Sequence, residues 1–518
     1  MNNSKMTKYI GHVASGTMLS RILGYVRDML VGWIFGAGMA ADAFYAAFRI
    51  PNLLRRLMGE GALSSSFVPV FSEYLTRKDR EESHKLYDVT FTALLIVLTF
   101  ISLLGIIFAP QITRLIAYGF SSNPEKMELT ILLTRLLFPF LLFICLAALQ
   151  LSVLNSLKLF FIPAVAPAFL SISEIVFMLG IAPLMIKEHQ IIGLALAVGL
   201  GGVMQFLVQV APVRKSGFKF KFNFNFNHPG LKQIFFMMIP AMWGISVDQI
   251  NAFVDTICAS FLREGSVTAL YYSNRVMQLP LALFGIAVAS VSLPLMSTSV
   301  SKNDPNEMKK ILAYSVKISS LAIIPAMAGL IVLGKPIIKL LFEHGKFNAN
   351  ATMLTNSALL FYSFGLPAYA ITKILVSSFY SMKETKTPVK IATLCMLTNV
   401  VLNVSLMGPM GVGGLALATS ISSWLNSSLL FFFLRKRIGR VGGRAIFECI
   451  LKIIAATSVM SLCCYFTAYH LFNNLILSVF GSIIIGIVVY VLMTKLLKID
   501  EMNSILSVLK KEEPTLDE

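Results

Sequence analysis

Charged residues are scarce in this 518-residue sequence, since they make up 14% of it while hydrophobic residues make up 56%. Apolar runs of about 20 residues recur from end to end, and each could cross the roughly 30 Å hydrocarbon core of a bilayer. The segments between these runs are too short to build a soluble domain. We therefore expect an all-α polytopic membrane protein.

The sequence also lacks the motifs of a catalytic or ATP-driven protein. It contains no HExxH, no GxxxxGK[ST], and no Ser, His and Asp at a spacing that would bring them together. The six cysteines lie in apolar spans without metal-ligand spacing, so we interpret them as packing residues. These absences favour a secondary transporter that does no covalent chemistry and needs no organic cofactor.

The net charge is +18, and the basic residues gather in alternate loops. They are Arg77, Lys78, Arg80, Lys158, Arg214, Lys215, Lys219, Lys221, Lys302, Lys383, Lys386, Lys390, Arg435, Lys436, Arg437, Arg440 and Arg444. This distribution is the positive-inside bias, and it predicts that both termini lie in the cytoplasm. It speaks against nucleic-acid binding. Residues 10–20 are too polar for the core of a signal peptide, so we expect the first helix to be retained.

We predict about fourteen transmembrane helices, and the two halves of the chain are related in sequence. YAAFRIP and SSFVPVFS near residues 45–72 correspond to YYSNRVMQLP and SVSLPLMSTS near residues 271–299. Such a parallel repeat predicts two six-helix lobes with a cavity between them, plus two extra C-terminal helices. The predicted domains are an N-terminal lobe (1–213), a linker (214–231), a C-terminal lobe (232–435), the extra helices (436–498) and a tail (499–518).

One apolar stretch, residues 20–73, carries an unusual number of charges. They are Arg21, Arg27, Asp28, Asp42, Arg49, Arg55, Arg56 and Glu60. A charge at the centre of a bilayer costs about 2.5–3.5 kcal/mol on insertion scales, so such residues usually face a cavity or a partner. Arginines are in excess, and guanidinium groups bind phosphate oxygens in pairs. The stretch therefore predicts a cationic cavity for a phosphate-bearing anion.

The spacing within this stretch indicates a shared site. Arg49, Asn52 and Arg56 fall on one helical face, which Glu60 continues. Pro51 should kink or loosen the helix there. We expect Asp28, Asp42 and Glu60 to orient the arginines or to form gating pairs. The alternative is that individual arginines lie near a membrane face and snorkel, or pair with the acids.

The second half offers two further groups of polar residues. Arg275 is either another ligand for the anion or a partner of Asp248 or Asp255 in its own lobe. Asp255, Asn399, Asn403 and Thr419 form a set of oxygen donors typical of a hard cation. This set predicts a Na⁺ or proton coupling site. The alternative is a hydrogen-bonded junction between helices.

The linker 214–231 alternates phenylalanine with basic or polar residues. One interpretation is a β-strand. The other, which we favour, is a basic and aromatic strip lying on the anionic cytoplasmic leaflet.

Three segments, SRILGYVRD, GAGMAADAFYAAFRIPNLLRRLMGEGALSSSFVPVFSEY and YYSNRVMQLP, resemble the signature of the MurJ/MviN family of bacterial lipid II flippases. The resemblance extends over essentially the whole chain. This family belongs to the multidrug/oligosaccharidyl-lipid/polysaccharide exporter superfamily. The resemblance implies two six-helix lobes, a central cationic cavity, and two C-terminal helices that form a groove for the polyprenyl tail.

The resemblance also implies functions for individual residues. The family's functional charges fall on Arg21, Arg27, Asp42, Arg55 and Arg275, with Arg49, Arg56 and Glu60 nearby. Its sodium site falls on Asp255, Asn399, Asn403 and Thr419. Asn274 stands where relatives often carry an acid, and Asn403 is neutral where an acid can occur, which removes a charge from the predicted cation site.

We therefore expect a flippase that moves lipid II across a bacterial plasma membrane by alternating access, driven by membrane potential or a Na⁺ or H⁺ gradient. Membrane lipids and the peptidoglycan synthesis machinery are its expected partners. A flippase for another undecaprenyl-pyrophosphate-linked polysaccharide unit is the main alternative, because it would recognise the same pyrophosphate. A cation-coupled multidrug antiporter is a weaker alternative, because its cavity would be acidic or aromatic.

Overall fold

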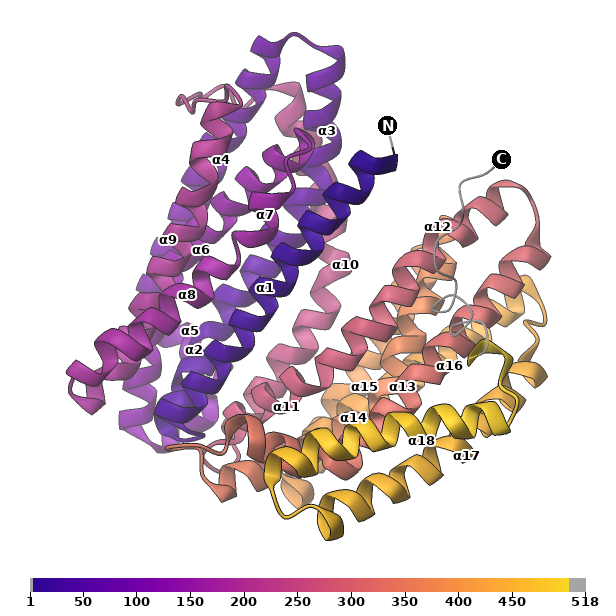
Figure 1. Ribbon diagram of the computed structural model, residues 1–518. Coiled ribbons are helices and arrows are strands. Elements are labelled where there is room, and N and C mark those ends of the chain that lie inside the picture. Colours follow the sequence, from indigo (N-terminus) through magenta and orange to yellow (C-terminus); the bar gives the residue numbers. More distant parts are fainter. Residues whose placement is uncertain (1–2, 503–518) are drawn as a thin grey trace. The chain divides into compact units, whose positions relative to one another are not determined.

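The computed structural model describes the backbone of residues 3–502 and the side chains of residues 16–502, except those of positions 60, 241, 243–245, 247 and 248. Within that part the chain folds into helices joined by loops, and no strand occurs (Figure 1). Ten of these helices are long and apolar enough to cross a membrane. The number of about fourteen spans stays a prediction. The predicted all-α fold class is confirmed.

The chain divides into two compact units, and the first comprises Met1–Thr268 together with His344–Phe347. Its helices are α1 (Asn3–Phe35), α2 (Met39–Leu54), η1 (Arg55–Leu63), α3 (Ser64–Arg77), α4 (Arg80–Ile107), α5 (Ala109–Ile116), η2 (Tyr118–Ser122), α6 (Pro124–Ser156), α7 (Phe161–Val165), α8 (Ala168–Val176), η3 (Phe177–Ile181), η4 (Ala182–Leu184), η5 (Lys187–His189), α9 (Gln190–Lys215), α10 (Pro229–Ser260) and the start of α11 (Ser266–Pro280).

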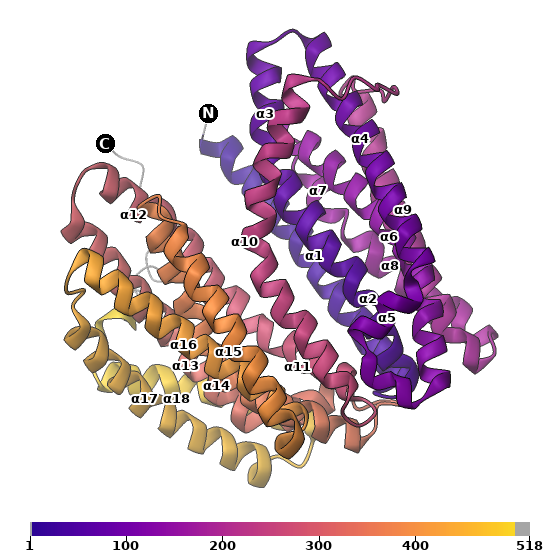
Figure 2. The same cartoon turned by 180° about the vertical axis from the view of Figure 1, so that it is seen from behind.

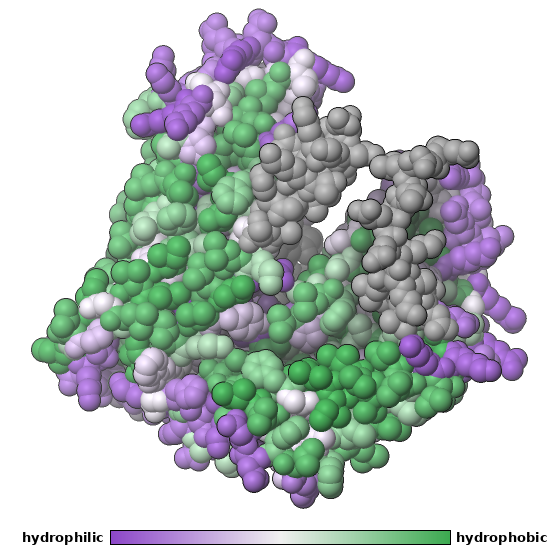
Figure 3. Space-filling view, in the orientation of Figure 1, coloured by the Kyte–Doolittle hydropathy of each residue, from purple (hydrophilic) through white to green (hydrophobic). Residues whose placement is uncertain are grey.

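Helix α6 forms the centre of the first unit. It packs against α2, α4 and α9, and Figure 1 and Figure 2 show α4, α6 and α9 side by side. Asn123 is the N-cap of α6 and its side chain accepts the N–H of Lys126, and Pro124 follows at the first helical position. On the face of this unit seen in Figure 3, hydrophilic residues gather where α3 meets α4, and a hydrophobic surface lies below them. This is the distribution expected of a membrane-spanning bundle.

The charged stretch forms one continuous helical segment with a change of winding. Helix α2 continues through Pro51, and the next nine residues, Arg55–Leu63, form the π-helix η1 before α3 begins. Pro51 supplies no N–H, and Gly59 and Gly61 favour irregular backbone, so the predicted loosening occurs here. Because a π-helix holds more residues per turn, the α-helical spacing used for Arg56 and Glu60 does not extend past Leu54.

The second unit comprises Ala269–Glu343 and Asn348–Glu518. Its described helices are the rest of α11, η6 (Leu281–Ile286), α12 (Ala287–Ser301), α13 (Pro305–Phe342), α14 (Ala349–Ser381), α15 (Lys386–Met410), α16 (Val412–Ile438), α17 (Gly443–Phe466), η7 (Thr467–Leu471), η8 (Leu477–Gly481) and α18 (Ser482–Leu496). The division places α10 in the first unit, whereas the predicted lobes divide at residues 214–231. The predicted lobes describe a sequence repeat, and they stay a prediction.

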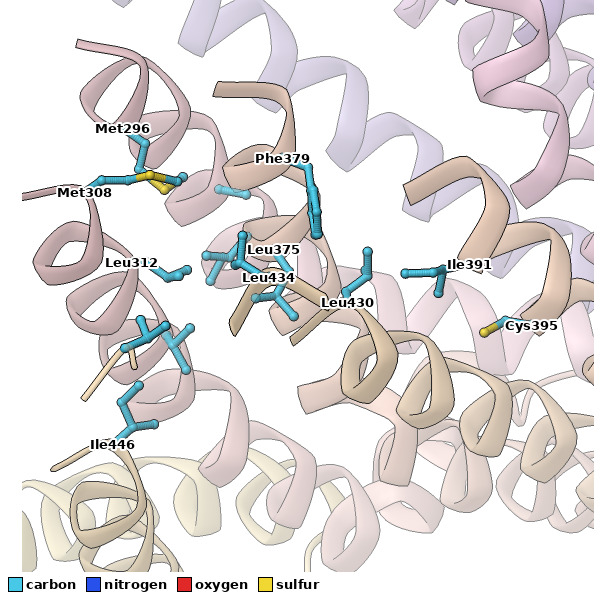
Figure 4. Close-up of a cluster of buried hydrophobic side chains, with 14 residues drawn as sticks. Met296, Met308, Leu312, Leu375, Phe379, Ile391, Cys395, Leu430, Leu434 and Ile446 are labelled. Atoms are coloured by element: carbon cyan, nitrogen blue, oxygen red, sulfur yellow. The ribbon is translucent and has the colours of Figure 1, made fainter. Parts of the chain in front are cut away.

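Figure 4 shows a hydrophobic core of the second unit, to which α12, α13, α14, α15 and α16 contribute. Met296, Leu312 and Phe379 are nearly inaccessible there, and Cys395 also packs in it. The two C-terminal helices attach to α13 through a second cluster, where the Tyr490 hydroxyl donates to the Leu321 carbonyl at 2.6 Å. Apolar side chains such as Leu462 and Ile484 remain exposed on these two helices, as a lipid-facing surface requires.

Candidate functional site: a buried network of arginines and carboxylates

Arg27 on α1 is held between two buried carboxylates. Its Nε and NH2 atoms donate to Asp28 Oδ1 at 3.1 and 2.8 Å, and its NH1 atom lies 3.4 Å from Glu174 Oε1 on α8. The Asp28 and Glu174 side chains are almost inaccessible, whereas 16% of the Arg27 side chain is exposed. Charge-assisted hydrogen bonds of this kind hold a guanidinium group in a defined orientation.

Asp42 is fully buried and joins three helices. Its Oδ2 atom accepts from Lys126 Nζ on α6 at 2.9 Å and from the Gly265 N–H at 2.7 Å. Its Oδ1 atom accepts from the N–H and the hydroxyl of Thr268 at 2.9 and 2.7 Å. These contacts place a negative charge at the N-terminus of α11, where the helix dipole favours it. Asp42 therefore acts as a structural junction within the first unit.

The arginines that follow on α2 and η1 have different surroundings. Arg49 is half-buried and donates to the Ala252 carbonyl on α10, from Nε at 3.0 Å and from NH2. Arg55 donates from Nε and NH2 to Asn52 Oδ1 at 3.0 and 2.9 Å. Asn52 thus contacts Arg55, and Arg56 is exposed. The Glu60 side chain lies outside the described residues.

The remaining predicted cations lie apart in the sequence. Arg21 is exposed on α1, six residues or about 1.7 turns before Arg27. Arg275 is half-buried on α11 and belongs to the second unit. The Asp248 side chain, its alternative partner, lies outside the described residues. The first unit therefore contains five of the six predicted arginines.

Three of the four residues predicted to bind a cation form a buried hydrogen-bonded chain in the second unit. Asn403 Nδ2 donates to Asn399 Oδ1 at 3.0 Å, and Asn399 Nδ2 lies 3.3 Å from Thr419 Oγ1. The Thr419 hydroxyl donates to the Leu415 carbonyl at 3.0 Å. Their oxygens are of the kind that Na⁺ prefers, but Asn399 Oδ1 already accepts a hydrogen bond. Asp255, which is buried, belongs to α10 of the first unit.

The sequence profile described as "Lipid II flippase MurJ" matches residues 31–500 of the chain. The chain belongs to the MurJ family. A Vibrio cholerae protein named "Probable lipid II flippase MurJ" is 38% identical over 426 residues, which cover 81% of this chain and 81% of that protein. A Burkholderia cenocepacia protein named "Lipid II flippase MurJ" is 36% identical over 429 residues, covering 82% of this chain and 83% of that protein.

The fold is also similar to solved structures. A structure titled "Lipid II flippase MurJ, inward closed conformation" aligns with a TM-score of 0.80 at 30% identity, and covers 94% of this chain and 99% of that one. An inward-facing multidrug transporter of the MATE family aligns with a TM-score of 0.64 at 16% identity, over 84% of this chain and 98% of that one. The second likeness concerns the fold alone. The chain is a multi-pass membrane protein of the MurJ family.

Sequence reasoning missed two charged residues of this MurJ network, Lys126 and Glu174. Lys126 lies between Glu125 and Glu128, just before a long apolar run, and therefore resembles an ordinary loop charge. Glu174 is a lone acid in the apolar run AFLSISEIVFMLG. An isolated ionisable residue within a membrane span is itself a signal of function or pairing, and that signal could have identified Glu174.

Proposed function

We propose that the chain translocates lipid II, a pyrophosphate-linked glycopeptide on a polyprenyl tail, from the cytoplasmic to the outer leaflet of a bacterial plasma membrane. The observation that carries the proposal is the alignment with a solved lipid II flippase over nearly the full length of both chains. Membership of a transporter family gives the chain no covalent reaction to perform. The alternatives, a flippase for another polysaccharide unit or a multidrug antiporter, have no comparable support.

The arginines supply the chemistry that a pyrophosphate needs. Arg21, Arg27, Arg49, Arg55, Arg56 and Arg275 are the proposed ligands for its oxygens and for the carboxylates of the headgroup. Asp28, Asp42 and Glu60 are the proposed orienting or gating residues. Arg27 is already paired with carboxylates, so a bound pyrophosphate would compete with Glu174, whose contact at 3.4 Å is the longer of the two. Such an exchange of anions lets the same arginine bind and release the headgroup.

Coupling to an ion or to the membrane potential is a further part of this proposal. A charged cycle gains about 2.3 kcal/mol per charge for every 100 mV of membrane potential. Asp255, Asn399, Asn403 and Thr419 are the proposed Na⁺ ligands, with Asp255 as the charged one. We further propose cytoplasmic termini, a polyprenyl tail that contacts the exposed apolar side chains of α17 and α18, and association with the peptidoglycan synthesis machinery.

Complementation tests the substrate. The chain is expressed in a bacterium depleted of its own lipid II flippase, alongside Arg55→Ala and Asn52→Ala. We expect the parent to restore growth and Arg55→Ala to fail at equal membrane abundance. Asn52→Ala removes the hydrogen-bond partner but keeps the charge of Arg55, so it should retain most activity.

Other outcomes separate the substrate from the arginines. Failure of a well-expressed parent would contradict lipid II transport, and would favour a different polysaccharide unit. Growth with both variants would retain the substrate but remove Arg55 from the proposed ligands.

A further inference from the structure

The segment that links α9 to α10 has five phenylalanines at alternate positions. We name residues 216–227 the phenylalanine strip, after Phe218, Phe220, Phe222, Phe224 and Phe226. It adopts no strand, although one interpretation of the sequence predicted it. Its backbone instead forms hydrogen bonds with side chains of α4. The position of the strip beside α4 determines what the strip can contact.

The strip follows α4 inward from the end of the bundle. At its start, Arg80 NH2 donates to the Ser216 carbonyl at 2.8 Å. Further on, the Lys221 N–H donates to Asp88 Oδ1 at 2.9 Å and the Asn223 N–H to Thr92 Oγ1 at 3.1 Å. Since a helix rises about 1.5 Å per residue, the strip advances about 18 Å along α4. Figure 1 and Figure 2 both place it beside the first turns of α4.

The strip then returns to the level at which it began. His228, just after the strip, lies with Nε2 3.8 Å from Glu82 Oε2 in the first turn of α4. The descent starts at Gly217, whose φ of +98° favours glycine and where a Cβ would lie 2.6 Å from the Arg80 guanidinium. The strip is therefore a loop with fixed ends and with its tip near Asn223.

The two halves of the strip differ in what covers their aromatic rings. Phe218 is buried against Phe71, His84 and Tyr87, and the Phe220 ring centroid lies 4.1 Å from that of Phe91. These two rings anchor the strip. Toward the tip, Phe222 and Phe224 are each 65% exposed and Phe226 is 45% exposed.

The exposed rings lie next to the apolar surface of α4 and among cations. One to two turns beyond Thr92, the side chains of Ile96, Val97 and Phe100 are exposed, as expected for a lipid-facing helix. Lys219 and Lys221, which alternate with the phenylalanines, are also exposed. Aromatic rings beside lysines suit the boundary between headgroups and acyl chains, where apolar surface is buried and ammonium groups reach anionic lipids.

We propose that Phe222, Phe224 and Phe226 insert into the headgroup–acyl boundary of the cytoplasmic leaflet, and that Lys219 and Lys221 make this contact selective for anionic lipids. The strip would then fix the depth of α4 and α10 in the bilayer. This function is separate from binding of the transported headgroup, because none of these residues contacts the arginine network.

The test places a tryptophan on the strip of the full-length chain. Phe224→Trp is reconstituted in vesicles of phosphatidylcholine and phosphatidylglycerol, with or without bromine on the acyl chains, and the emission of the parent chain is subtracted. We expect the added emission to be blue-shifted and quenched by bromine. The matched control is Asn225→Trp, at the exposed polar position next to Phe224, and its emission should be quenched much less.

Equal, solvent-like emission from both variants, without quenching by brominated lipid, would overturn the insertion. Because Phe224 is exposed, neither variant should change the melting temperature in detergent, and this separates a failed insertion from a misfolded protein. We expect the quenching of Phe224→Trp to increase with the phosphatidylglycerol content of the vesicles. Adding Lys219→Gln and Lys221→Gln to Phe224→Trp removes both charges but retains the Lys221 N–H that binds Asp88, so in this triple variant the increase should disappear. Quenching of Phe224→Trp that does not depend on phosphatidylglycerol would overturn the selectivity for anionic lipids.

Discussion

Asp42 Oδ2 and Lys126 Nζ lie 2.9 Å apart, and both side chains are buried. Three further donors complete the environment of Asp42, namely the N–H groups of Gly265 and Thr268 and the hydroxyl of Thr268. Lys126 also lies 4.0 Å above the ring of Phe120. Asp42, which the sequence predicts to orient arginines, thus holds the start of α11 against α2 and α6.

Removing one partner of this pair should destabilise the first unit strongly. A buried charge that loses its partner typically costs about 3–5 kcal/mol. We expect Lys126→Met and Asp42→Asn each to lower the melting temperature in detergent, and the double variant to recover much of the loss. Lys85→Met is the control, because Lys85 forms an exposed pair with Glu81, and such pairs contribute little to stability. Strictly additive losses would contradict the coupling.

The contacts of Arg27 predict that Arg27→Ala impairs folding as well as transport. Loss of growth in this variant would therefore not separate the two effects. This substitution leaves Asp28 and Glu174 buried without their guanidinium partner, so we expect a loss of roughly 3–5 kcal/mol and reduced membrane abundance. Arg27→Ala/Glu174→Gln removes one of the two carboxylate charges and should restore most of the abundance. If Arg27 binds the headgroup, this double variant still fails to complement growth. Growth of the double variant would instead assign Arg27 a structural role.

His228 should make stability depend on pH. Burial lowers the pKa of His228 below its usual value near 6.5, an effect that Glu82 opposes and Lys85 adds to. Its Nδ1 atom accepts the Gly230 N–H at 3.2 Å at the start of α10, and a protonated ring cannot accept. The unfolded chain therefore binds the proton more readily. The contribution is fully present above about pH 6.5 and is lost as pH falls through the folded pKa.

His228→Asn tests this pH dependence. Asparagine is a good N-cap and does not titrate, so melting temperatures measured between pH 5 and pH 8 should vary less than in the parent. An unchanged pH profile would show that the dependence arises at other groups.

The proposed Na⁺ site predicts opposite effects of two substitutions. Asp255→Asn removes the charged ligand and should abolish stimulation of transport by Na⁺. Asn403→Asp adds a carboxylate to the buried amide chain and should raise the apparent affinity for Na⁺ severalfold. Assays with K⁺ in place of Na⁺ are the control. Undiminished, Na⁺-independent transport by Asp255→Asn would refute the site.

Hydropathy is sufficient to predict the helices. A segment that crosses the lipid has a long apolar run, and its backbone N–H and C=O groups must be hydrogen-bonded within the protein, which leaves few alternatives to a helix. Hydropathy is not sufficient for the site. Contacts such as Arg27 with Glu174 join residues far apart in sequence, and no local pattern encodes them. The π-helical winding of η1 could not be predicted from residue spacing either. The prediction that Arg49 and Arg56 share a face requires 3.6 residues per turn over the whole stretch. Pro51 and the glycines indicated that the helix would be irregular, but not that the irregular part would be a π-helix.

The π-helix at Arg55–Leu63 gives the charged segment a phase shift. Each residue of an α-helix turns the chain by about 100°, whereas a π-helix holds more residues per turn, so each residue of η1 turns the chain by less. Arg49 therefore faces another direction relative to α3 than it would in a regular α-helix of the same length. The contact of Arg55 with Asn52 is local and would survive a change of winding, but the contact of Arg49 with the Ala252 carbonyl on α10 depends on it. A homologue of the same length that is α-helical throughout this segment would need its cation at a different position to reach the same carbonyl.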